Sequence, residues 1–159
     1  MMRLLGALCL LVGAVGLYRL LALRARRRAG IYAGILRLLQ YISVEISCFC
    51  TAREALFSSF QDEILEKNGF LPALRASGCI PDAIRASEVN IAEADLALLA
   101  EFDASLGGSF HEEQLEICAY YVERWREQEG AVRASLPSEI RLTRTVTLSG
   151  GMLLFLLLL

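Results

Sequence analysis

Histidine and proline are scarce in this chain of 159 residues, which contains one histidine, His111, and three prolines. One imidazole and scattered thiols do not build a convincing tetrahedral zinc site. The sequence contains no phosphate-binding loop of the G-x-x-x-x-G-K-S/T type and no G-x-S-x-G nucleophile elbow. We therefore expect no catalytic residue, no cofactor and no metal ion, and a protein that is not an enzyme.

Acidic side chains are absent from both ends of the chain. All 18 Asp and Glu residues lie between Glu45 and Glu139. The window Leu4–Leu23 has a single charged residue, Arg19, and Thr145–Leu159 has none. Because apolar runs of this kind suit lipid as a solvent, we predict a transmembrane helix at each end.

The arginines beside these two segments predict their orientation. Arg24 and the run 26–28 follow the first segment, and Arg141 and Arg144 precede the second. The positive-inside rule places both flanks in the cytoplasm. The predicted parts are a transmembrane anchor at 1–23, a cytoplasmic helical domain at 24–142 and a second transmembrane anchor at 143–159, which makes a double-pass membrane protein.

Alternatives stay open at both ends. The first segment also loosely fits a signal peptide cleaved near Gly16, and Cys9 raises a lipoprotein reading, although the bulky Leu8 precedes it. The 15 residues of Thr145–Leu159 span about 22 Å as a helix, against a hydrocarbon core of about 30 Å. This segment therefore crosses the bilayer if Arg144 snorkels, and otherwise enters one leaflet.

The middle of the chain is strongly acidic, although the formal net charge is only −2. Eight basic residues there oppose 18 acidic ones and give −10, whereas eight arginines near the ends give +8. Phosphate repels an acidic domain, so we expect no nucleic acid as a partner. The arginines lie where anionic headgroups would be, so membrane lipid is an expected partner. We expect no small-molecule substrate.

The five cysteines do not form a familiar site. They are Cys9, Cys48, Cys50, Cys79 and Cys118. One residue separates Cys48 from Cys50, whereas redox and zinc motifs have two. Four of the five fall in the predicted cytoplasmic domain, where disulfides are rare. We expect buried or half-buried thiols that behave as small apolar side chains.

Apolar periodicity predicts a helix over 30–50, either continuous with the first anchor or jointed at Gly30. Its predicted inner face is Ile31, Ile35, Leu38, Ile42, Ile46 and Phe49. A capping box at Thr51–Glu54 predicts a second helix that ends near Lys67, before Asn68-Gly69. Its predicted inward residues are Leu56, Phe60, Ile64 and Leu65. One or two short helical turns should follow between residues 70 and 87.

Two longer helices are predicted after this segment. Asn90 should cap the first, which ends at Gly107-Gly108. Its predicted stripe is Ile91, Leu98, Leu99, Phe102 and Leu106. A capping box at Ser109–Glu112 should open the second, which runs to about Ser135. Its predicted inner side is Leu115, Cys118, Ala119, Val122, Trp125 and Val132.

Pro137 marks either a break or the first turn of the helix that enters the membrane. Period-two alternation is absent. The expected fold is therefore all-α, an antiparallel helical bundle flanked by an N-terminal and a C-terminal transmembrane helix.

Small residues suggest a packing face on the predicted membrane helices. Gly6, Cys9, Gly13 and Gly16 follow steps of three, four and three, and the second segment contains Ser149, Gly150 and Gly151. Small side chains let helix backbones approach closely in lipid. Our hypothesis is that this face docks the second helix or a helix of a partner. The alternative is that glycine is simply frequent in membrane helices.

Several short patches occur in an informative order. They are 36–40, 44–46, 51–56, Leu106-Gly107 with Ser109 and Gln114, and a basic approach to a glycine-containing terminal helix that ends in a leucine run. In these patches and in its layout the chain resembles the stage III sporulation protein AB family, small membrane proteins of endospore-forming bacteria. Ala52 and Arg53 depart from the family pattern, in which a proline is expected.

The resemblance implies a domain similar to the cytoplasmic domain of the type II secretion inner-membrane platform protein, the F domain. It implies a non-enzymatic platform or assembly component of the channel between mother cell and forespore, required for stage III of sporulation. The expected location is the mother-cell membrane around the forespore. The expected partners are other stage III channel proteins, including an ATPase encoded beside the chain.

Two other functions stay open on the residues alone. The chain could be a membrane-anchored helical regulator that binds and restrains a membrane enzyme. It could also be a cryptic membrane enzyme that uses His111, Glu112 or Glu113.

Overall fold

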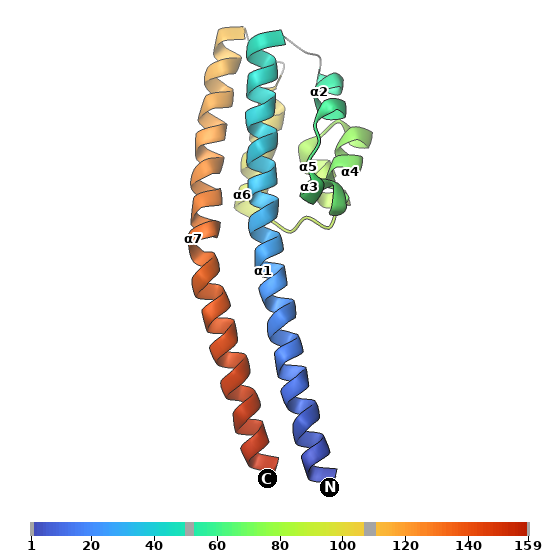
Figure 1. The fold of residues 1–159 in the computed structure, drawn as a ribbon. Helices are drawn as coiled ribbons and strands as arrows, with labels where there is room; N and C mark the ends of the chain where they lie inside the picture. The colour runs from blue at the N-terminus through green and yellow to red at the C-terminus, as the bar shows by residue number, and fades with distance from the viewer. Residues whose placement is uncertain (1, 50–52, 107–110, 159) are drawn as a thin grey trace. The chain divides into compact units, whose positions relative to one another are not determined.

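The computed structural model describes residues 2–49, 53–106 and 111–158, with side chains placed for 12–47, 55–106 and 112–152. All secondary structure in these ranges is helical (Figure 1). The helices are α1 (Met2–Phe49), α2 (Arg53–Ser59), α3 (Glu63–Lys67), α4 (Phe70–Ser77), α5 (Ile80–Ala86), α6 (Glu93–Ser105) and α7 (His111–Leu158). The prediction of an all-α fold is confirmed.

The chain forms two compact units. We call Met1–Ala29 with Val132–Leu159 the terminal-helix unit, and Gly30–Ala131 the central unit. Among the residues that the structure describes, no helix is both long enough and apolar enough to cross a membrane. The predicted parts 1–23, 24–142 and 143–159 stay a prediction.

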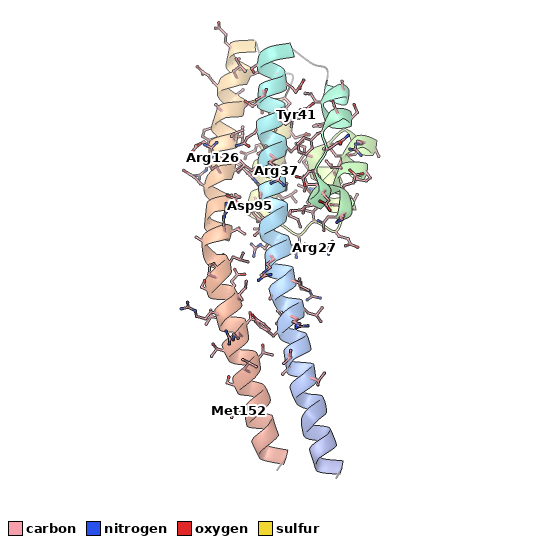
Figure 2. All side chains as sticks on the ribbon, viewed as in Figure 1. Arg27, Arg37, Tyr41, Asp95, Arg126 and Met152 are labelled. Carbon is pink, nitrogen blue, oxygen red and sulfur yellow. The ribbon has the colours of Figure 1, made fainter. Side chains whose placement is uncertain are left out.

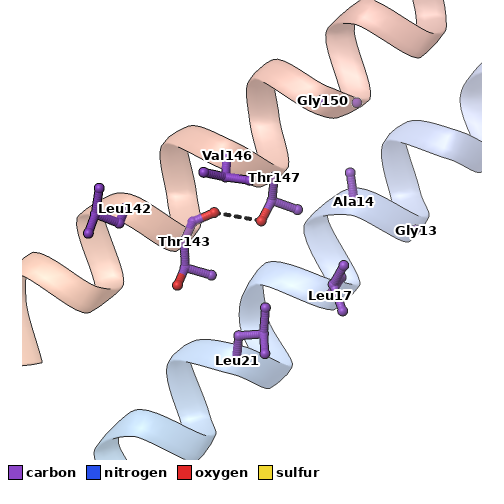
Figure 3. Close-up of a pocket in the computed structure, with 10 residues that line it drawn as sticks. Gly13, Ala14, Leu17, Leu21, Leu142, Thr143, Val146, Thr147 and Gly150 are labelled. Carbon is purple, nitrogen blue, oxygen red and sulfur yellow. Dashed lines mark hydrogen bonds between the residues drawn. The ribbon is translucent and has the colours of Figure 1, made fainter.

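In the terminal-helix unit the two ends of the chain run antiparallel. Leu21 of α1 and Leu142 of α7 line the same groove, as do Ala14 and Gly151 further along (Figure 3). Helix α7 continues through Pro137, which is exposed, so both readings of this residue were wrong. A proline here removes one backbone hydrogen bond, to the carbonyl four residues earlier. A helix of 48 residues retains many others on both sides.

Helix α1 is continuous across Gly30 and supplies a large share of the core of the central unit. The predicted inner residues Ile31, Ile35, Leu38, Ile42 and Ile46 are all buried; the side chain of Phe49 lies outside the described residues. Tyr32 and Leu39 are buried as well, at 0% and 1% exposure. The buried face is therefore wider than the predicted stripe, because other elements pack on more than one side of α1.

The single helix predicted up to Lys67 is wrong. Helix α2 ends at Ser59, and α3 begins after Asp62, whose backbone is extended at φ −150° and ψ 122°. Oδ1 of Asp62 accepts hydrogen bonds from the amides of Ile64 and Leu65, at 3.0 and 3.1 Å. Aspartate competes for backbone amides in this way, which favours a cap over a helix interior. The predicted cap Thr51 lies outside the described residues.

Burial in this segment follows the prediction except at one position. Leu56, Phe60 and Leu65 are buried, whereas Ile64 is 37% exposed. The predicted stop holds, since Asn68 caps α3 and Gly69 has φ +75°. The expected short turns are the two helices α4 and α5, separated at Gly78, where φ is +64°. Glycine adopts these left-handed conformations without a steric cost.

Helix α6 begins later than predicted, because Ala92 rather than Asn90 is its N-cap. No side chain caps it locally; instead the amide of Ala92 donates to the hydroxyl of Tyr32 at 3.3 Å. The N-cap residue is thus held by a tertiary hydrogen bond, where the sequence suggested a local side-chain cap. Of the predicted stripe, Leu99 and Phe102 are buried, and Ile91, Leu98 and Leu106 are partly buried.

Helix α7 is longer than the predicted helix that ends near Ser135. Cys118 and Trp125 are buried as predicted, but Ala119 is exposed. Leu115, Val122 and Val132 are partly buried. The predicted ends at Gly107-Gly108 and Ser109 lie outside the described residues.

Candidate functional site

A buried contact among three helices fixes the face that α7 presents in the central unit. The rings of Tyr32 and Trp125 stack, with centroids 5.3 Å apart and planes 16° apart. Nε1 of Trp125 donates to the backbone oxygen of Tyr32 at 3.0 Å, and the hydroxyl of Tyr32 donates to Oδ2 of Asp95 at 2.5 Å. Since Trp125 is fully buried, the opposite side of α7 faces outward.

Ion pairs occupy every basic side chain that the structure describes in the central unit. The pairs are Arg37–Asp62, Lys67–Glu63, Arg75–Glu66, Arg85–Asp82, Arg124–Glu127 and Arg126–Glu123 (Figure 2 labels Arg37 and Arg126). The unit contains 7 basic and 17 acidic residues, a formal charge of −10. The remaining acids therefore leave an uncompensated negative charge.

Part of this excess charge is exposed on helices α6 and α7. Glu112, Glu113 and Glu116 are exposed near the start of α7, and Glu93 and Glu101 are exposed on α6. We call Glu112, Glu113 and Glu116 the acidic turn. Acidic side chains in the first turn of a helix are favoured by its dipole, so Glu112 and Glu113, which lie in that turn, also help to start α7. A surface of this charge attracts basic partners and repels phosphate.

The described thiols are poorly suited to nucleophilic chemistry. Burial raises the pKa of the Cys118 thiol, which is 1% exposed. Burial is also the main cause of the raised pKa of Cys79. A raised pKa keeps a thiol protonated, and the thiolate is the reactive form. Cys50 and the side chains of Cys9, Cys48 and His111 lie outside the described residues.

Metal-ligating side chains are dispersed in the described part of the chain. No group of three or more His, Cys, Asp or Glu side chains there is placed to hold a metal ion. The two buried carboxylates serve the fold instead. Asp95 accepts from Tyr32, and Asp103 accepts from the amide of Ile80 at 3.3 Å.

An apolar groove of about 670 Å³ runs between the two helices of the terminal-helix unit (Figure 3). Helix α1 lines it with Gly13, Ala14, Leu17 and Leu21. Helix α7 lines it with Leu142, Thr143, Val146, Thr147, Gly150 and Gly151. The hydroxyl of Thr147 donates to the backbone oxygen of Thr143 at 2.5 Å, so this polar group is satisfied within the helix. We call this feature the terminal groove.

The residues of the predicted small-residue face lie in different surroundings, and the packing hypothesis stays a prediction. Gly151 is buried, and a Cβ on it would lie 3.1 Å from Cβ of Ala14. Gly13 and Gly150 line the terminal groove, while Gly16 is exposed outside it. Among the side chains that the structure describes, none lies within 4 Å of a Cβ built on any of these three. The exposed hydroxyl of Ser149 donates to the backbone oxygen of Thr145 at 2.7 Å. The surroundings of Gly6 and the side chain of Cys9 lie outside the described part of the chain.

Two contributions to these surfaces could not be identified from single motifs. Ala14 meets Gly151, but it was not counted among the small residues of the face. Its position one residue after Gly13 is a weak signal. The ion pairs join residues up to 25 positions apart. Which acidic side chains are paired, and which are left in excess, therefore depends on the tertiary fold.

The sequence matches the model of a known protein family. The model of the family described as stage III sporulation protein AB matches residues 3–159, nearly the whole chain. The chain belongs to the stage III sporulation protein AB family. Membership gives it a role in stage III of sporulation. No curated protein and no solved structure matches the chain.

Proposed function

We propose that this stage III sporulation protein AB family member is a non-enzymatic membrane platform or assembly component of the channel between mother cell and forespore. The apolar runs of the sequence, Leu4–Leu23 and Thr145–Leu159, would anchor it in the membrane. The central unit would lie in the mother-cell cytoplasm, where it would contact other stage III channel proteins. A likeness of this unit to the type II secretion F domain is part of the proposal.

One observation carries the proposal, the division of charge between the two units. The terminal-helix unit has 9 arginines and 1 acidic residue, a formal charge of +8, against −10 for the central unit. Arginines beside apolar runs favour the cytoplasmic face of an anionic membrane. The acidic unit is repelled by that surface and is available to soluble basic partners.

The membrane location is tested by fractionation of sporulating cells that make the full-length chain. We expect the chain to pellet with membranes, to resist carbonate extraction and to enter detergent. Recovery from the supernatant after detergent-free lysis would contradict the proposed anchoring. Protection of cysteines placed at each terminus would then report which side of the membrane the two ends occupy.

The partner surface is tested by binding between the detergent-solubilised chain and the adjacent stage III ATPase. We expect Glu113→Gln with Glu116→Gln to weaken binding and to reduce its salt dependence, because the acidic turn supplies excess charge. The matched control is Glu123→Gln with Glu127→Gln, which removes equal charge from residues already paired with Arg126 and Arg124. Equal effects of the two variants would contradict the assignment of the acidic turn.

Co-purification separates this proposal from the regulator. Recovery of several channel components supports the platform. Recovery of one membrane enzyme, with a change in its activity on removal of the chain, would favour the regulator instead.

A further inference from the structure

We propose that the terminal groove binds an anionic phospholipid, with an acyl chain along the groove and the headgroup at its arginine-rich end. The inference rests on the proposed membrane location. It goes further by assigning one discrete lipid site to named residues, rather than general contact with the bilayer.

The lining of the terminal groove suits an acyl chain. Leu17, Leu21, Leu142 and Val146 line it and are 36–68% exposed, so their apolar surfaces remain open. Contiguous apolar surface of this kind marks a binding site for an apolar ligand. From Gly13 to Leu21 the groove follows α1 for about 12 Å, at about 1.5 Å per residue.

Glycine keeps the terminal groove open at the end away from the arginines. Gly13 and Gly150 line this end from the two helices, and a Cβ on either would meet none of the described side chains within 4 Å. A larger side chain at Gly13 would therefore enter the groove without a clash with the partner helix. Filling by substitution is a direct test of occupancy.

The other end of the terminal groove is positively charged. Arg24 follows Leu21 by three residues, which places both on neighbouring turns of one helix face. On α7, Arg144 is the neighbour of Thr143, whereas Arg141 lies on the side of the helix opposite the groove-lining residues, at about 100° per residue. Arg24 and Arg144 are exposed. The one acid in this unit, Glu139, precedes Leu142 by three residues and so lies on the groove side of α7. It accepts a hydrogen bond from the hydroxyl of Ser135 at 3.3 Å. The net charge at this end is positive even with Glu139 ionised.

Charge complementarity selects the occupant. An apolar helix from a second copy or another protein could also fill the groove, but it would bring no negative charge to Arg24 and Arg144. An anionic phospholipid provides a phosphate and an acyl chain in one molecule. Guanidinium groups bind phosphate through short, charge-assisted hydrogen bonds.

The test is native mass spectrometry of the full-length chain in detergent, titrated with palmitoyl-oleoyl phosphatidylglycerol. Phosphatidylcholine with the same chains is the control for the headgroup. We expect one bound phosphatidylglycerol per chain and weaker phosphatidylcholine binding. Replacing Arg24 or Arg144 by Gln should weaken phosphatidylglycerol binding roughly fivefold for each arginine and leave phosphatidylcholine nearly unchanged.

Two glycine variants provide a matched pair. Gly13→Leu should reduce binding of both lipids, because its side chain occupies the terminal groove. Gly16→Leu adds the same side chain to the same exposed helix outside the groove and should leave binding unchanged. Equal behaviour of the two variants, or equal affinity for the two lipids, would overturn the lipid site.

The outcomes also separate this inference from the proposed function. A chain that pellets with membranes but shows no preference for phosphatidylglycerol retains the anchoring and loses the lipid site. If Gly13→Leu changes the oligomeric state without changing lipid binding, a helix is the occupant and the lipid site is wrong. A chain found in the soluble fraction of cells would contradict the anchoring itself.

Discussion

The hydroxyl of Tyr32 bonds to the carboxylate of Asp95, 63 residues further along the chain, at 2.5 Å. The same hydroxyl accepts a hydrogen bond from the amide of Ala92. One side chain therefore bonds to both a carboxylate and a backbone amide at the start of α6. Helix α6 has no local side-chain cap. Its first turn is therefore set by α1, which makes the start of α6 depend on the tertiary fold.

Tyr32→Phe should destabilise the full-length chain by about 1–3 kcal/mol, the cost of leaving buried polar groups without partners. The ring and its stack on Trp125 are retained, so the loss of stability measures the contribution of the hydroxyl. Urea unfolding in detergent, followed by circular dichroism, measures the effect. Tyr41→Phe retains the ring contact with Phe60 and should change stability by less than about 0.5 kcal/mol. Equal losses in the two variants would contradict the role of the Tyr32 hydroxyl.

A second prediction concerns the close approach of α3 to α1. A Cβ on Gly34 would lie 2.9 Å from Cγ of Leu65 and 3.3 Å from Oδ1 of Asp62. Leu65 is fully buried and cannot move away freely. Gly34→Ala should therefore destabilise by about 1–3 kcal/mol from overpacking, less about 0.5–1 kcal/mol gained from helix propensity.

Gly130→Ala is the control for this substitution. Gly130 is also helical and exposed, and its added Cβ would meet nothing within 4 Å. It should stabilise by about 0.5–1 kcal/mol, because only the propensity gain remains. Thermal unfolding of both variants beside the parent chain would show opposite shifts. A stabilised Gly34→Ala variant would mean that α3 does not pack here.

The sequence was sufficient where one helix face decides the structure. Ile31, Ile35, Leu38, Ile42 and Ile46 were placed in the core by their spacing alone, and Asn68 and Gly69 were identified as a stop. Each of these depends on periodicity or on local backbone preference, which short windows of sequence contain.

The prediction failed where distant contacts outweigh local signals. Asn90 was a reasonable cap, but α6 begins after Ala92, whose amide bonds to the Tyr32 hydroxyl on another helix. Tyr32 itself was missed, because a half-polar ring one position from Ile31 does not mark a second buried face. Pro137 suggested a break, but α7 continues through it, because the many other backbone hydrogen bonds of this long helix outweigh the one that is lost. Candidate binding surfaces were harder still to predict from the sequence, because the terminal groove is lined by residues more than 120 positions apart.

A third prediction concerns Asp62, which joins two structural roles. Oδ1 caps α3, and Oδ2 accepts from Nε of Arg37 at 2.9 Å. Asp62→Ala should cost about 0.5–2 kcal/mol from the lost cap, with a smaller loss from the ion pair. Asp82→Ala removes an exposed pair with Arg85, at 3.5 Å, and should cost less than about 1 kcal/mol. Chemical denaturation distinguishes them, and a larger loss at Asp82 would contradict the capping role.

The fourth prediction follows from the buried thiol of Cys118. Burial raises the pKa of this thiol in the folded chain, whereas an unfolded thiol has a pKa of about 8.5. The folded state thus holds its proton to a higher pH, so this contribution to stability is fully present below about pH 8.5 and is lost above it. Cys118→Ala should flatten the decline in unfolding free energy between about pH 8 and 10. Burial also raises the pKa values of Cys79 and Tyr121, which leaves a residual slope.

Alkylation provides an independent measurement of the same thiol. Iodoacetamide reacts with thiolates, so a buried, protonated thiol should react slowly in the folded chain. Site-by-site mass spectrometry should find Cys79, which is only partly buried, modified before Cys118. Urea should remove the difference, because both thiols then reach the solvent. If Cys118 reacts first in the folded chain, α7 does not bury this side of the helix, and the register set by Trp125 is wrong.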